Sequence, residues 1–139
     1  MLLGDSRLLT ALAPVLVKNI DRINLAHLHA LLKASGLDRR YVWLLQNVRP
    51  AIVTRWPRVS AAHLRRRYRR AGLVLDTFLD SIPAPEHAPP RDILDPDIRA
   101  PRTVERIATH ASHISRSWSI VTALAPTDFA AALAPRLRR

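Results

Sequence analysis

Apolar residues recur at the spacing of an α-helix between Ser60 and Ile82. At about 100° per residue, six residues share one stripe: Leu64, Tyr68, Ala71, Leu75, Phe78 and Ile82. The charged residues of the same stretch fall on the opposite side of the cylinder. The pattern predicts a long amphipathic helix over 60–82, capped by Ser60 and closed by Pro83.

Prolines and a glycine divide the N-terminal half into three shorter helical segments. The first covers about 6–19 and the second about 22–35, where Gly36 provides the stop. The third begins at Asp38 and is expected to end at Pro50. Only a short helical turn then fits before the next proline.

A second long helix is expected over 102–125. Its apolar residues alternate in spacing between three and four positions, as in the buried seam of a helical bundle. These residues, called here the 104–125 seam, are Val104, Ile107, Ala111, Ile114, Trp118, Val121 and Ala125. A short helix is expected to follow from Thr127.

A Pro-rich connector, 83–101, joins the two long helices and holds six of the eleven prolines. Such a composition favours an extended, semi-rigid segment. Its acids either lie against a neighbouring basic face or belong to a surface loop, and the loop is favoured. These acids are Glu86, Asp92, Asp95 and Asp97.

Few glycines and few alternating β-branched residues argue against a sheet protein. We therefore expect one all-α domain over 1–139, a compact bundle of five or six helices that ends in a basic tail, 135–139. The lack of cysteine excludes disulfides and thiolate zinc sites. No signal peptide or membrane span is recognisable, so a cytoplasmic location is expected.

Arginine dominates the charge of the chain, with 20 Arg against 2 Lys, a formal net charge of +11 and a pI of about 11.6. Five arginines lie on the polar side of the 60–82 helix: Arg65, Arg66, Arg67, Arg69 and Arg70. Like charges at helical spacing repel by roughly a few tenths of a kcal/mol per pair. Phosphate backbone would relieve that repulsion. A GC-rich genome also favours arginine over lysine, but it does not explain 22 basic against 11 acidic residues.

A weaker basic strip is expected on the second long helix, formed by Arg102, Arg106, His113 and Arg116. Serines nearby could add hydroxyl contacts to a sugar–phosphate backbone. Other arginines are candidates to widen the basic surface: Arg39, Arg40, Arg49, Arg55, Arg58 and, in the tail, Arg136, Arg138 and Arg139. Trp56 is placed where a base could stack, although a half-buried position is favoured.

Catalysis, metal binding and cofactors find little support in the sequence. No Gly-rich phosphate loop, nucleophile elbow or cysteine nucleophile occurs. The connector acids lie in a segment where rigid placement is doubtful, and the six histidines lack the spacing of a metal site. We therefore expect no enzyme activity, no metal and no cofactor.

The sequence thus predicts non-catalytic, largely sequence-independent binding of nucleic-acid backbone, RNA or DNA, through arginine-rich helix faces. The alternative is a protein-interaction module whose basic faces bind acidic surfaces, with the 104–125 seam as a partner or self-association interface. A helix-turn-helix regulator is less favoured because the link between the candidate helices is too long. Membrane-surface binding is disfavoured because the apolar and basic faces are cleanly opposed.

In gross character the chain resembles the small helical subunits of multisubunit CRISPR effector complexes. The resemblance covers the whole chain in size, charge and helicity, and it rests on the Arg65–Arg70 run and the helix layout, without a diagnostic motif. It implies a structural subunit of a ribonucleoprotein in antiviral defence, stacked in copies along a guide-bearing filament. The basic faces would then steady the guide–target duplex or the displaced strand. No residue role is carried over by position.

Overall fold

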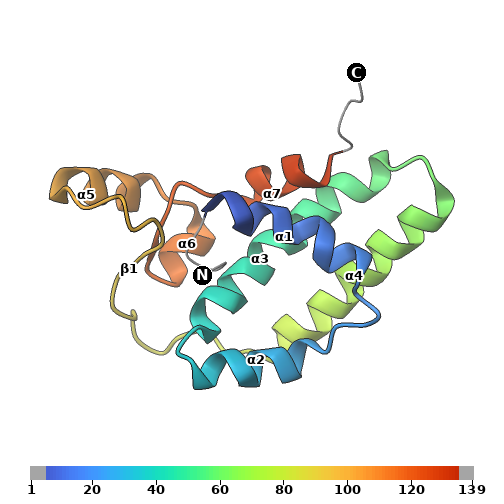
Figure 1. Ribbon diagram of the computed structural model, residues 1–139, viewed down its shortest axis with the longest axis horizontal. Coiled ribbons are helices and arrows are strands. Elements are labelled where there is room, and N and C mark those ends of the chain that lie inside the picture. Colours follow the sequence, from blue (N-terminus) through green and yellow to red (C-terminus); the bar gives the residue numbers. More distant parts are fainter. Residues whose placement is uncertain (1–5, 135–139) are drawn as a thin grey trace.

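The computed structural model describes residues 6–134 (Figure 1), so the expected basic tail lies outside the described residues. The elements follow in the order α1 (Ser6–Lys18), α2 (Leu25–Ala34), α3 (Asp38–Arg55), the 3₁₀ turn η2 (Trp56–Arg58), α4 (Ala62–Asp80), β1 (Asp92–Ile93), α5 (Pro101–His110), α6 (His113–Ser117), β2 (Ile120–Val121) and α7 (Pro126–Leu133). The expectation of a mainly helical chain is confirmed. The described part holds seven α-helices instead of five or six, and it adds a two-stranded sheet.

Helix α3 forms the centre of the fold. It runs through the middle of the molecule in Figure 1, and α2, α4, α6 and α7 all pack against it. Its buried residues lie on almost every side of the helix: Tyr41, Val42, Trp43, Leu44, Leu45, Asn47, Val48, Ala51 and Ile52. A helix with this pattern is stable only when other elements surround it. Trp43 packs edge-on against Phe129 of α7, with the ring centroids 6.1 Å apart.

The predicted end of this helix at Pro50 is wrong, because α3 continues to Arg55. Proline lacks the N–H that would bond to the carbonyl four residues earlier, and in a helix interior it costs about 3 kcal/mol. Pro50 lies on a half-exposed side of α3, whereas the next two residues, Ala51 and Ile52, are each 1% exposed. We attribute the continuation to the burial of these two side chains, which opposes the cost of the proline.

The long helix predicted over 60–82 is present as α4, Ala62–Asp80. Ala61 occupies the N-cap position without a side-chain hydrogen bond, so Ser60 is not the cap that the sequence suggested. The expected stripe also differs at its start, because Leu64 is 40% exposed. Contact with the core is made further along, by Tyr68, Ala71, Leu75, Phe78 and Leu79. The first turns of α4 therefore extend beyond the core.

The second long helix predicted over 102–125 is wrong. Helix α5 ends at His110, the backbone of Ala111 is extended, and α6 follows as a separate short helix. Ser112 is the N-cap of α6, since its hydroxyl accepts a hydrogen bond from the Ser115 N–H at 3.2 Å. A serine that bonds to the local backbone in this way competes with a continuous helix.

The 104–125 seam reaches the core from several elements instead of one. Ala111 and Val121 are buried, and Ile114 and Trp118 pack partly buried against the core. The break also turns Ser115 inward, where its hydroxyl accepts a buried hydrogen bond of 2.9 Å from the indole N–H of Trp43. This bond joins α6 to α3. The seam residues of α5, Val104 and Ile107, are only half-buried and do not belong to the core.

The connector is mostly irregular, but its middle pairs with the segment after α6. Strand β1 runs parallel to β2, with Asp92 opposite Ile120 and Ile93 opposite Val121. Leu94, the next residue, is 1% exposed and donates its N–H to the Val121 carbonyl at 3.1 Å. The expected surface loop is therefore anchored in the core at one point.

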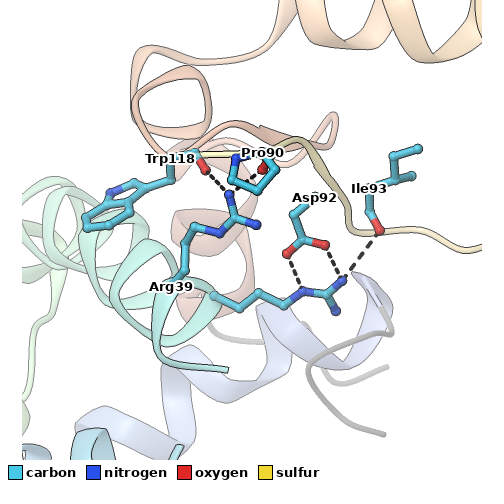
Figure 2. Close-up of polar contacts among 6 residues, drawn as sticks. Arg39, Pro90, Asp92, Ile93 and Trp118 are labelled. Carbon is cyan, nitrogen blue, oxygen red and sulfur yellow. Dashed lines mark hydrogen bonds and ion pairs between the residues drawn. The ribbon is translucent and has the colours of Figure 1, made fainter. Parts of the chain in front are cut away.

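Two arginines at the start of α3 hold the connector in place (Figure 2). Arg39 donates through Nη1 to the carbonyl oxygens of Pro90, at 2.5 Å, and Trp118, at 3.1 Å. Arg40 donates to both carboxylate oxygens of Asp92, each at 2.6 Å, a contact that suits the fork of a guanidinium. We call these contacts the connector clasp. Arg39 and Arg40 thus act as internal bridges, and the expectation that they widen the basic surface is wrong.

Asp92→Asn is expected to lower the free energy of unfolding at pH 7 by about 1.5–3 kcal/mol, the range for hydrogen bonds to charged groups. The hydrogen bonds from Arg40 hold the pKa of the Asp92 carboxyl below its ordinary value. Such a carboxylate stabilises the fold fully above its unfolded pKa of about 4 and loses this contribution as pH falls through the lower folded pKa. Urea denaturation should therefore show a smaller deficit of the variant at pH 3 than at pH 7.

The control is Glu105→Gln, which removes an exposed pair with Arg91. This variant should cost much less stability than Asp92→Asn, because exposed ion pairs contribute little. Equal losses in the two variants, or a deficit of Asp92→Asn that does not change with pH, would contradict the stabilising role of the connector clasp.

Ser115→Ala is expected to destabilise the fold by about 1–3 kcal/mol, because it leaves the buried indole N–H of Trp43 without an acceptor. Ser117→Ala on the same helix is the matched control, since its exposed hydroxyl bonds only to the His113 carbonyl. That change should stay within about 0.5 kcal/mol. Thermal unfolding of both variants measures the difference, and a control as damaging as Ser115→Ala would refute the assignment.

Candidate nucleic-acid interface

The five arginines of the Arg65–Arg70 run are all exposed on α4, but their guanidinium groups have different surroundings. Within residues 6–134, Arg65 and Arg66 make no side-chain hydrogen bond or ion pair. Both lie in the first turns of α4, which extend beyond the core. Their charge is therefore available to a ligand.

Arg67 and Arg70 instead tie α4 to the end of α1. Arg67 donates to the carbonyl oxygen of Lys18 at 2.6 Å, and Arg70 donates to the carboxylate of Asp21 at 3.1 Å. Lys18 is the last residue of α1, where helix carbonyls lack partners and carry partial negative charge. These two arginines thus have a structural role on the same helix.

Arg69 covers the ring of Trp56, with its guanidinium carbon 5.7 Å from the ring centroid. Trp56 is half-buried, which was the favoured expectation for this residue. A guanidinium over an indole face gains a cation–π attraction of about 0.5–1 kcal/mol at exposed sites. The contact fixes the η2 turn against the exposed side of α4.

The turn between α3 and α4 brings Arg55 and Arg58 next to the start of α4. Here a pocket of about 330 Å³ opens between the turn, α4 and the end of α7. We call it the corner pocket, and its main lining residues are Arg55, Arg58, Val59, Leu64, Tyr68 and Leu133. No pattern in the sequence indicates this pocket, because it exists only where α7 meets α4.

Two polar groups of the corner pocket show its electrostatic character. The Tyr68 hydroxyl donates to the Leu133 carbonyl at 3.4 Å, and burial raises the pKa of Tyr68 while the positive charge of Arg55 partly opposes this rise. The Nε of Arg55 is buried and has no acceptor within residues 6–134. The described lining contains no carboxylate, so the pocket is positively charged.

The second basic strip predicted from the sequence is not formed by one helix face. Arg102 and Arg106 are exposed on α5, whereas Arg116 is exposed on α6, because the chain breaks at Ser112. His113 likewise belongs to α6 and not to α5. Arg116 borders a small separate hollow.

The ten arginines predicted as site residues therefore fall into two groups. Figure 1 shows α5 and the α3–α4 turn at opposite ends of the long axis. The corner group consists of Arg55, Arg58, Arg65, Arg66, Arg67, Arg69 and Arg70. The α5–α6 group consists of Arg102, Arg106 and Arg116. Arg49, another candidate, forms an ion pair with Asp76.

Within residues 6–134 no three His, Cys, Asp or Glu side chains are grouped so that they could hold a metal ion. None of the helices described there is both long and apolar enough to cross a bilayer.

Comparison with protein-family models, with curated proteins and with solved structures found no match to this chain.

Arg67→Ala is expected to lower the free energy of unfolding by roughly 0.5–1.5 kcal/mol, because it removes the hydrogen bond to the carbonyl of Lys18. Arg66→Ala, its neighbour without a partner in the described chain, should change stability by less than about 0.5 kcal/mol. Urea denaturation of both variants is the measurement. Identical stabilities of the two variants would refute the division into structural and free arginines.

Proposed function

We propose that this chain binds the phosphate backbone of nucleic acid, without catalysis and with little reading of sequence. The observation that carries the proposal is the corner group, where Arg58, Arg65 and Arg66 are exposed and make no ion pair within residues 6–134. Two more arginines belong to this group: Arg55 lines the corner pocket, and Arg69 covers the ring of Trp56. Several positive charges without intramolecular compensation favour a multiply anionic ligand.

The mechanism is the neutralisation of phosphate charge. Each arginine that contacts a phosphate releases condensed counterions, so the affinity falls as the salt concentration rises. The slope of log affinity against log salt concentration becomes steeper by about 0.7–0.9 for each contact. Guanidinium groups suit this role because their planar fork can make two hydrogen bonds to one phosphate. Asn and Gln, which read bases in the major groove, are absent from the Arg65–Arg70 run, so little sequence readout is expected.

The α5–α6 group takes a secondary place in this proposal. Figure 1 shows α5, which carries Arg102 and Arg106, at the opposite end of the molecule from the α3–α4 turn, so these two arginines would contact a different stretch of the polymer. Glu105 also lies on α5, where its negative charge is balanced by the ion pair with Arg91. The resemblance to small CRISPR effector subunits would make the chain part of a ribonucleoprotein, and this assembly belongs to the proposal.

The test is the double variant Arg65→Gln/Arg66→Gln, with Arg102→Gln/Arg106→Gln as a control that removes the same charge. The corner variant should lower the log–log salt slope of binding by about 1.4–1.8, because two phosphate contacts are lost. The control should lower it by less than half as much. Fluorescence anisotropy with labelled RNA and DNA at several salt concentrations, on protein freed of co-purified nucleic acid, gives the slopes.

Equal effects of the two double variants would mean that net charge alone attracts the polymer, and an unchanged corner variant would refute the assigned interface. If the wild-type chain binds polyglutamate but no nucleic acid at low salt, the basic surface is made for an acidic protein partner instead.

A further inference from the structure

The corner pocket combines two kinds of lining that one simple ligand would not satisfy. Arg55 and Arg58 bring positive charge, while Val59, Leu64 and Leu133 bring an apolar wall. A bare phosphate would leave the apolar wall uncovered, and an apolar side chain would leave the arginines without a counter-charge. The lining therefore fits a ligand that has both an anionic part and an apolar part. A volume of about 330 Å³ is in the lower range of small-ligand sites.

Arg55 differs from the other arginines of α3, because its side chain makes no hydrogen bond or ion pair within the described part of the chain. Arg39 and Arg40 belong to the connector clasp, and Arg49 pairs with Asp76. The Nε of Arg55, by contrast, is buried without an acceptor among the described residues. So covered an atom cannot itself meet an acceptor from outside the chain. The two terminal nitrogens of the same guanidinium, which are neither buried nor hydrogen-bonded within residues 6–134, are the donors that can.

We propose that the corner pocket accepts one unpaired nucleotide of a single-stranded nucleic acid, with its phosphate at Arg55 and Arg58 and its base against Leu64 and Tyr68. This inference rests on the proposed function, in which Arg65 and Arg66 hold phosphates nearby on α4. Bases in a duplex are stacked and paired and cannot enter a pocket, whereas a single strand presents them freely. The chain should therefore prefer single-stranded to double-stranded nucleic acid.

Ala61→Phe tests the pocket without changing the charge. Ala61 lines the pocket at the N-cap of α4, and its extended backbone (φ −73°, ψ 122°) can carry any side chain. The wild type should bind labelled oligothymidylate and oligouridylate about tenfold more tightly than duplexes of equal length at the same salt concentration, as expected for a contribution from base stacking. Ala61→Phe should remove this preference and leave duplex affinity within about twofold.

A second variant covers the case in which the bulky residue disturbs the fold. Leu64→Gln removes part of the apolar wall at a residue that is already 40% exposed, so the fold should be kept. It should also reduce single-strand affinity and spare duplex affinity. Circular dichroism confirms that both variants remain helical.

The outcomes separate this inference from the proposed function. If Arg65→Gln/Arg66→Gln weakens binding but the pocket variants leave the ratio of single-strand to duplex affinity unchanged, the corner pocket does not hold a nucleotide and only this inference fails. A wild type with no preference for single strands would overturn it as well. If the wild type binds neither polymer, the inference and the proposed function fail together.

Discussion

The burial of α3 on almost all sides determines where the rest of the chain lies. Although α2, α4, α6 and α7 all contact this helix, both of its ends reach the edge of the core. At the first end, Arg39 and Arg40 meet acceptors in the connector and close the fold. At the other end, Arg55 meets no acceptor among the described residues and borders the corner pocket. One helix therefore organises both the core and the candidate interface.

The same residue type has opposite roles in this chain, and the neighbouring acceptor decides which role applies. Arg40 and Arg67 face a carboxylate and a helix-end carbonyl, so their charge is used inside the molecule. Arg65 and Arg66 face neither within the described residues, and their charge remains for a partner. A count of arginines along the sequence therefore overstates the binding surface. The packing of α1 and of the connector decides which arginines are bonded inside the molecule and which remain free.

The fold could be predicted where burial follows one regular period, and not where local bonds interrupt it. The pattern over 60–82 predicted α4 correctly because one face of this helix packs on the core from Tyr68 onward. The 104–125 seam misled because its buried members belong to several elements, while Ser112 breaks the helix through a bond that periodicity does not show. The division of the ten arginines into two groups, and the corner pocket itself, depend on contacts between elements distant in sequence.

The arginines of α4 that bond to other elements support the helical turns that carry the free arginines. The first turns of this helix extend beyond the core, as the exposed Leu64 shows, and would otherwise be poorly held. The bonds of Arg67 to α1 and of Tyr68 to α7, with Arg69 over Trp56, hold these turns from three sides. A rigid support reduces the entropy that binding must spend on ordering the surface. Structural and free arginines on adjacent positions of one helix therefore make a surface that is both charged and pre-organised, with the corner pocket at its edge.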